Sequence, residues 1–227
     1  MPDNNEKVRL GLVASGSGTD ANAIMSACNS GNITNAESIV LISTKPGVGC
    51  LEKARRNQVE AVVVDKKALG SDRFRNELDR LFGIYDLELI FLVGCVVVFQ
   101  PFVGFPMYNI HPADPKKHGG KKMYGLKVHE HVLLSIKDQI ERGMKSISTD
   151  RFFTYPTVHE VIADPDQGQP LIQAMVQIPP VLIHDLMSDH YALSQLAERL
   201  QKHVLPYEWL LLPCAVEMAA RRILEQR

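Results

Sequence analysis

The sequence predicts an α/β protein with a Rossmann-like, mostly parallel, doubly wound sheet, an antiparallel C-terminal hairpin and C-terminal helices. Short apolar runs alternate with segments of helical spacing through the first half of the chain, which is the β-α-β-α order of such a sheet. Two β-rich runs then flank a polar loop, and helical spacing returns at the end of the chain. These three observations together indicate the fold class.

Five apolar runs predict the strands of the sheet. The first four runs are short, rich in Val, Ile and Leu, and bounded by turn residues, as buried parallel strands are, and the fifth is a short segment that contains Asn109. The runs are Val8–Ala14, Ser38–Ser43, Ala61–Val64, Leu87–Val93 and Met107–Ile110. Helices are predicted between the first four, at Asp20–Asn29, Cys50–Gln58 and Asp72–Phe82. Ligands bind such sheets at the carboxyl ends of the strands, so we expect the site in the loops after Ala14, Val93 and Ile110.

The second half of the chain has a different character. The expected segments are a helix at about Val128–Gly143 and a hairpin of Tyr155–Ile162 and Leu171–Ile178 around the polar loop 163–168. Helical spacing covers Asp189 to Arg227 and is interrupted near Pro206 and Pro213. Because proline removes a backbone donor, we expect two or three helices there. The length of 227 residues suits one α/β domain spanning 1–227.

The composition excludes several classes of partner. The formal net charge is -1, and no Lys/Arg stripe interleaved with aromatic residues occurs, so we expect small-molecule substrates and no nucleic acid. No apolar run approaches the ~20 residues that span a bilayer, and the N-terminus is polar, so we expect no membrane association. The four cysteines are scattered without a C-x-x-C pair, which predicts a reducing compartment, the cytoplasm. The sequence makes no prediction of oligomeric state.

A glycine-rich loop joins the first strand to the first helix. It contains Gly16, Ser17, Gly18, Thr19 and Asp20. Backbone N–H groups and the helix dipole at such a loop favour an anion, so one interpretation is a phosphate site. The other is a tight turn with Thr19 or Asp20 as the N-cap and nothing bound. A dinucleotide fingerprint is not favoured, because Ala21 stands where a third glycine would be needed.

Asn109 and His111 stand two residues apart at the end of the fifth run, directly before Pro112. Residues two apart on a strand project to the same side, so the carboxamide and the imidazole can converge on one point. That combination stabilises the oxyanion that forms when a carbonyl is attacked. For an isolated pair, the alternative is a structural role in the loop.

Two later loops extend this candidate site. The basic, glycine-rich segment Gly119–Gly125 could close over an anionic substrate, or it could be a solvated loop. In the hairpin loop, a carboxylate at Asp164 or Asp166 could orient the imidazole and raise its pKa, although turn aspartates are often only turn residues. His129 and His131 should point to different faces of a helix, so we expect no metal site.

In this order, the segments resemble the folate-dependent formyltransferases over most of the chain. The motifs that carry the resemblance are SGSGTDANAIM, LVGCVVVFQPF, NIHP, HGGKKMYG, TVHEVIADPDQGQPLIQ and LAERLQKHVLPY. The most specific pair is NIHP with the downstream aspartate of D-x-G. The resemblance implies transfer of a formyl group from 10-formyltetrahydrofolate, a co-substrate, to the amine of a small phosphorylated acceptor. Glycinamide ribonucleotide, an intermediate of purine biosynthesis, is the acceptor most closely implied.

The resemblance also assigns the residues of the site. The implied catalytic residues are Asn109, His111 and Asp166. The half of about 1–110 is expected to bind phosphate and the half of about 111–227 to bind folate. Implied substrate-binding positions are Gly16, Ser17, Gly18, Thr19, Asp20 and Lys202. Implied folate-binding positions, acting through their backbone, are Val96, Val97, Val98, Phe99, Ala163, Asp164 and Pro165.

The chain departs from the family pattern on the acceptor side. Asp20 replaces an asparagine, Val97 an arginine, and Lys202 a glutamate that holds the substrate amine in the family. A cation at Lys202 should repel an ammonium group. Three alternatives therefore stay open: hydrolysis of 10-formyltetrahydrofolate, formylation of another amine, and a catalytically idle module that binds folate or phosphate. The hydrolase is disfavoured, because its N-terminal regulatory domain is not found in this sequence.

Overall fold

The computed structural model describes residues 7–188 and 190–227. The polar segment 1–6 and Asp189, where the last helical segment was expected to begin, lie outside the described residues. Within them, the main sheet has seven strands in the order β3-β2-β1-β4-β5-β7-β8. Its strands are β1 (Val8–Ala14), β2 (Ala36–Ser43), β3 (Glu60–Val63), β4 (Leu89–Leu92), β5 (Met107–His111), β7 (Thr157–Glu160) and β8 (Pro170–Gln173). A separate ladder pairs β6 (Phe153–Thr154) with β9 (Val176–Gln177).

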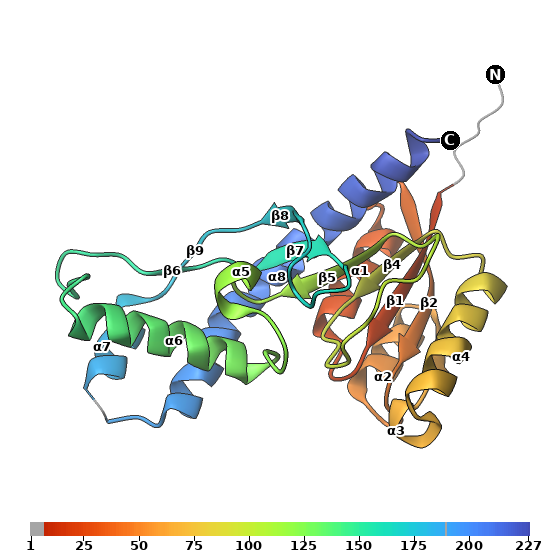
Figure 1. The fold of residues 1–227 in the computed structure, drawn as a ribbon. Coiled ribbons are helices and arrows are strands. Elements are labelled where there is room, and N and C mark those ends of the chain that lie inside the picture. The colour runs from red at the N-terminus through yellow and green to blue at the C-terminus, as the bar shows by residue number, and fades with distance from the viewer. Residues whose placement is uncertain (1–6, 189) are drawn as a thin grey trace.

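Helices cover both faces of the sheet, as the predicted doubly wound class requires (Figure 1). They are α1 (Thr19–Ser30), α2 (Gly49–Arg56), α3 (Lys66–Leu69), α4 (Ser71–Ile84), α5 (Pro115–His118), α6 (Leu126–Glu141), α7 (Pro180–Met187) and α8 (Leu193–Leu224). Alternate residues of β4 enter different cores: Leu89 and Phe91 pack with α1, α2 and α8, whereas Ile90 and Leu92 pack with α4. This alternation explains why the central strands are apolar throughout.

The order of the strands reverses at β1, which lies between β2 and β4. The pairs from β3 to β5 are parallel, and β7 and β8 extend the sheet as an antiparallel hairpin. The predicted strands are thus confirmed. The hairpin is also present, but its second predicted run divides into β8 and β9, and β9 pairs with β6 in the separate ladder. A crevice at the carboxyl ends of β1 and β4 is the place where open α/β sheets bind ligands.

The prediction for the C-terminal segment was wrong. Instead of two or three helices, α8 runs without interruption from Leu193 to Leu224, with Pro206 and Pro213 inside it, and α7 precedes it. Each interior proline costs about 3 kcal/mol. A fully buried apolar side chain contributes about 1.5–3 kcal/mol, and α8 buries its stripe along its whole length. Packing therefore outweighs the two prolines.

α8 joins two separate hydrophobic cores. Its first part, with Leu196, Leu200 and Val204, packs with α6 and α7, and its second part, from Leu211 onward, packs under the sheet with α1. Figure 1 shows α6 and α7 standing to one side of the sheet, with α8 reaching across to it. No helix among the described residues is long and apolar enough to cross a membrane.

Gly18 provides a test of the turn between β1 and α1. Its φ is 73°, and a Cβ there would lie 2.4 Å from Cβ and 2.5 Å from Cα of Cys50 on α2. We expect Gly18→Ala to lower the free energy of unfolding by about 2–5 kcal/mol, from left-handed strain and overpacking together. Urea titration followed by circular dichroism measures this change.

Gly31 is the matched control. Its φ is 77°, yet nothing lies within 4 Å of a Cβ built on it, so Gly31→Ala should cost only the strain of about 1–2 kcal/mol. Equal losses in the two variants would contradict the close approach of α2 to this turn.

Candidate functional site

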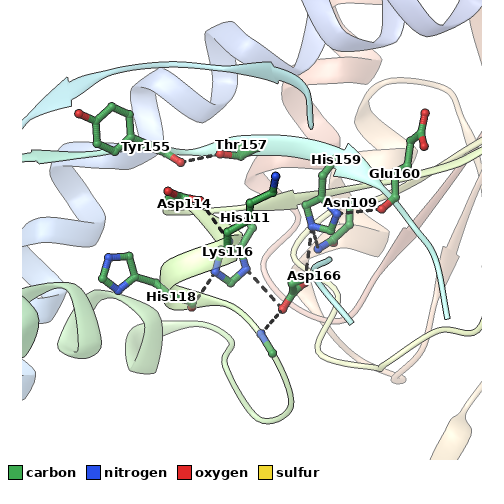
Figure 2. A network of polar contacts seen from close by, with 11 residues as sticks. Asn109, His111, Asp114, Lys116, His118, Tyr155, Thr157, His159, Glu160 and Asp166 are labelled. Atoms are coloured by element: carbon green, nitrogen blue, oxygen red, sulfur yellow. Dashed lines mark hydrogen bonds and ion pairs between the residues drawn. The ribbon is translucent and has the colours of Figure 1, made fainter. Parts of the chain in front are cut away.

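A cavity of about 330 Å³ opens at the carboxyl ends of β1, β4 and β5. Its wall includes Asn109, His111 and Asp166, three polar residues that the sequence predicted to meet. Figure 2 shows these side chains turned toward one another, with His159 among them. The chain therefore brings together an amide, two imidazoles and a carboxylate from segments that are remote in sequence.

Strand pairing positions the amide and the imidazoles. Asn109 and His111 both lie on β5, and the antiparallel register places His159 of β7 directly opposite Asn109. Residues opposite each other in antiparallel strands share a face. Asn109 Nδ2 accordingly lies 3.3 Å from His159 Nε2. The predicted convergence of Asn109 and His111 on one side of the strand follows from the same geometry.

Asp166 reaches this group from the loop between β7 and β8. Its Oδ2 is 3.9 Å from His111 Nδ1, and its Oδ1 is 3.5 Å from His159 Nε2. The backbone N–H of Gly120 donates to Oδ2 at 2.9 Å. A Cβ at Gly119 would lie 2.7 Å from Cβ of Asp166, so only glycine allows this close approach. The loop of Gly119–Gly125 thus holds the carboxylate in place.

The hydrogen-bond partners determine which ring nitrogens carry protons. His111 Nε2 lies 3.0 Å from the carbonyl oxygen of His118, and His159 Nδ1 lies 2.9 Å from that of Glu160. A carbonyl oxygen only accepts, so in the neutral rings these two nitrogens are the donors. The remaining nitrogens, His111 Nδ1 and His159 Nε2, face Asp166. Protonation of either nitrogen would make that nitrogen a donor to Asp166.

The pKa values are shifted in this cluster. Burial lowers the pKa of His111 below its usual value, although the charge of Asp166 acts in the opposite direction. The carboxylate thus raises the pKa of His111 as expected from the sequence, but burial outweighs its charge, so the net shift is downward. Burial alone would raise the pKa of Asp166, but a proton on His159 Nε2 and the backbone N–H of Gly120, which donate to the carboxylate, outweigh burial and lower that pKa.

His159 was missed by the sequence analysis. It is 1% exposed, and its ring joins Asn109 to Asp166. A signal was present, because a histidine stands among alternating residues of a predicted strand, directly before the loop that contains Asp166. His129 also lines the cavity, is 1% exposed, and has no hydrogen-bond partner for Nδ1 among the described residues. Burial lowers the pKa of His129 to about 4, so its ring is neutral.

Only some of the residues expected to bind the acceptor line the cavity. Of the glycine loop, Ser17, Thr19 and Asp20 line the cavity, whereas Gly16 and Gly18 do not. Gly18 is the N-cap of α1, so neither Thr19 nor Asp20 has that role. Lys202 on α8 is exposed and is not among the residues that line the cavity.

Most of the residues expected to bind folate also line the cavity. Val96, Val97, Val98, Phe99 and Pro165 line it, whereas Ala163 and Asp164 do not. The two segments are joined, since the side chain of Gln100 donates to the carbonyl oxygen of Ala163 at 3.3 Å. Most of this wall is apolar. Among the described residues, no group of three His, Cys, Asp or Glu side chains could hold a metal ion.

Two further carboxylates line the cavity, Asp20 from the first turn of α1 and Glu208 from the middle of α8. They are 8% and 5% exposed. Burial raises the pKa of Asp20 to about 6, against a hydrogen bond from Trp209 that lowers it. Burial also raises the pKa of Glu208 well above its usual value, and the charge of Asp20 adds to this effect. Glu208 was not predicted, because helical spacing alone does not reveal which polar residue faces a cavity.

Comparison with known proteins gives one consistent result. Residues 8–199 match the family model described as formyl transferase. The chain is 30% identical over 176 residues to a chloroplastic phosphoribosylglycinamide formyltransferase of Arabidopsis thaliana, covering 75% of this chain but only 55% of that protein. It is 29% identical over 181 residues to the phosphoribosylglycinamide formyltransferase of Haemophilus influenzae, covering 76% and 74% of the two chains. Glycinamide ribonucleotide transformylase 1 of Symbiobacterium toebii superimposes with a TM-score of 0.73 at 26% identity, covering 96% and 90% of the chains.

The buried Asp20 gives a pH-dependent prediction. Its ordinary pKa of 3.8 is raised to about 6 by folding, so the folded state binds the proton more tightly. The stability that this provides is fully present below pH 3.8 and is lost as the pH rises through about 6. A carboxamide at this position would not titrate. We therefore expect the change in unfolding free energy caused by Asp20→Asn to be about 2–3 kcal/mol more favourable to the variant at pH 8 than at pH 4.

Urea unfolding at the two pH values measures this difference. Asp79→Asn is the control, because Asp79 is exposed on α4. If Asp20→Asn changed the stability equally at pH 4 and pH 8, the assigned burial of the carboxyl group would be wrong.

Proposed function

Because the chain belongs to the formyl transferase family, we propose that it transfers a formyl group from 10-formyltetrahydrofolate to the amine of a small phosphorylated acceptor. Glycinamide ribonucleotide, named by its relatives, is the acceptor that we propose. One observation carries the proposal: Asn109, His111 and Asp166 meet, with His159, at a single cavity of ligand size. Such an arrangement suits attack on a carbonyl group.

Asn109 supports the first step. The amine nitrogen attacks the formyl carbon, and negative charge develops on the formyl oxygen. An amide nitrogen has two hydrogens, and only one of those of Asn109 is needed for the contact with His159 Nε2 at 3.3 Å. The other is available to donate to the oxyanion. Removing one such donor typically costs ~10²–10³ in rate.

Asp166 and His111 support the proton transfer. The attacking nitrogen must lose a proton, and the folate nitrogen must gain one as its bond to the formyl carbon breaks. His111 Nδ1, His159 Nε2 and a carboxylate of lowered pKa face one another, so a proton released here is shared and can be passed on. Once protonated, His111 Nδ1 is a second donor for the oxyanion. General acid–base help of this kind typically contributes ~10²–10⁴.

The cavity wall fits a folate as co-substrate. Val96, Val98 and Phe99 offer an apolar surface for a flat ring system, and the backbone of this segment and of Pro165 lies at the same side. A hydrogen bond anchors the segment, since the backbone N–H of Val96 donates to Ser15 Oγ at 3.2 Å. We propose that these residues bind 10-formyltetrahydrofolate. No residue in this scheme requires a metal.

The acceptor is proposed to lie on the other side of the reacting group. Ser17 and Thr19, at the positive end of the α1 dipole, line that part of the cavity and suit a phosphate group. The half of about 1–110 would thus bind the acceptor and the half of about 111–227 much of the folate, within one domain of 1–227. All four cysteines are free thiols, which supports our proposal that the chain works in the cytoplasm.

Turnover of two variants tests this function. With 10-formyltetrahydrofolate and glycinamide ribonucleotide, the protein should release tetrahydrofolate, which absorbance measures continuously. We expect His111→Ala and Asp166→Asn each to lower kcat by about 10²–10⁴-fold, because each removes one member of the proton-transfer group.

Thermal unfolding should show that both variants stay folded, and Asp79→Asn on the exposed face of α4 is the control for turnover. Wild-type rates in both variants would exclude the mechanism, and absence of turnover in the unchanged protein with any amine would exclude the function.

A further inference from the structure

Asp20 and Glu208 are not needed for the chemistry described above. They come from different elements, the first turn of α1 and the middle of α8, and both side chains line the same cavity. Both are more than nine-tenths buried, and Asp20 Oδ1 has no hydrogen-bond partner among the described residues. A buried carboxylate without a full set of partners is costly, and because Asp20 and Glu208 both line the cavity, a ligand bound there can offset that cost.

The surroundings leave this pair short of positive charge. No ion pair is found for either residue within the part of the chain that the structure describes, and Lys122 is the cavity's one Lys or Arg side chain there. Lys122 lies in the same loop as Gly120, whose N–H contacts Asp166. Burial raises both carboxyl pKa values, and the charge of Asp20 raises that of Glu208 further. A cation placed between the two would relieve both effects.

Glu208 occupies a special place on α8. It lies between Val204, in the core formed with α6 and α7, and Leu211, in the core under the sheet. Burying a carboxyl group at this position costs stability, because its charged form loses its hydration. A buried ionisable group that faces a cavity at the expense of stability is typical of a functional position.

The pair lies beside the reacting group. Asp20 Oδ2 is 3.9 Å from a Cβ position built on Gly94, which directly follows Val93 at the end of β4. β4 is the neighbour of β5, with Leu92 opposite Asn109. Asp20 is therefore one strand away from the proposed oxyanion donor, and a group held by the pair has access to the same cavity.

We propose that Asp20 and Glu208 form an ammonium-binding subsite, which receives the acceptor amine in its protonated form and accepts the proton that it must lose before attack. This inference rests on the proposed function. An ammonium group has three donors, and the two carboxylates have enough acceptor sites for all of them. As the ammonium binds, the pair gives up its own shared proton to solvent. One ammonium proton then moves to the pair, and the neutral amine attacks the formyl carbon.

The subsite defines a class of acceptor. A primary or secondary amine that is protonated in water binds as a cation, whereas a hydroxyl or a neutral amide of the same size leaves both carboxylates without a counter-charge. Lys202 stands where the family has a glutamate that holds the substrate amine, and it is exposed and outside the cavity. Asp20 and Glu208 would hold the acceptor amine instead. The phosphate of the acceptor would lie apart from the pair, at Ser17 and Thr19.

Calorimetry on the full chain without folate tests the subsite. Glycinamide ribonucleotide carries the ammonium, and ribose 5-phosphate carries the phosphate alone. For Glu208→Gln and Asp20→Asn, we expect glycinamide ribonucleotide to bind about 10- to 100-fold more weakly, and ribose 5-phosphate to bind as in the unchanged protein. Titration in two buffers of different ionisation enthalpy should show proton release with glycinamide ribonucleotide, and this release should be lost in the double variant.

Glu198→Gln is the matched control, since Glu198 is exposed on the same helix and outside the cavity. Both test variants should fold, because each replaces a carboxyl group of raised pKa by a neutral group of the same shape. Unchanged affinity for glycinamide ribonucleotide in both variants, equal weakening of both ligands, or no binding by the unchanged protein would each overturn the inference. Binding with proton release but without turnover would support the subsite and contradict the proposed function instead.

Discussion

The candidate site depends on the position of one carboxylate, Asp166, between two imidazoles. β5 and β7 pair so that His111 and His159 lie on one face, and the β7–β8 loop returns Asp166 to them at 3.9 and 3.5 Å. The N–H of Gly120 fixes the same carboxylate from a third segment. A shift of one residue in the β5–β7 register would turn His159 to the face opposite His111, so the antiparallel pairing is the constraint on which the chemistry depends.

The carboxylates that line this cavity have opposite pKa shifts, because their burial and their neighbours differ. Asp166 is half-buried and accepts from the N–H of Gly120 beside two imidazoles, and its pKa is lowered in spite of burial. Burial raises the pKa values of Asp20 and Glu208, and the charge of Asp20 raises that of Glu208 further. One cavity therefore contains carboxylates whose pKa values are shifted in opposite directions. Separated acid and base properties of this kind are what a transfer between two nitrogens requires.

α8 connects the two halves of the molecule and brings the carboxylate of Glu208 to the cavity. Its two prolines remove backbone donors, yet the helix continues because its apolar stripe packs against both cores. Because α8 is continuous, the direction in which each side chain points around the helix axis is fixed along its whole length. The helix directs Glu208 into the cavity and leaves Lys202 exposed, six residues earlier. The proposed acceptor side of the site thus depends on helix packing as well as on the loop after β1.

Local patterns in the sequence determined the order of strands and helices along the chain and the hairpin. They also determined the common face of Asn109 and His111, because spacing along one element sets which side chains share a side. The motifs also indicated Asp166. Only the tertiary structure decided that His159 joins this group, that Glu208 faces Asp20, and that α8 passes through Pro206 and Pro213. It also decided that the pKa of His111 falls. Each of these features depends on contacts between remote segments and on burial. The residues adjacent in sequence set neither the contacts nor the burial.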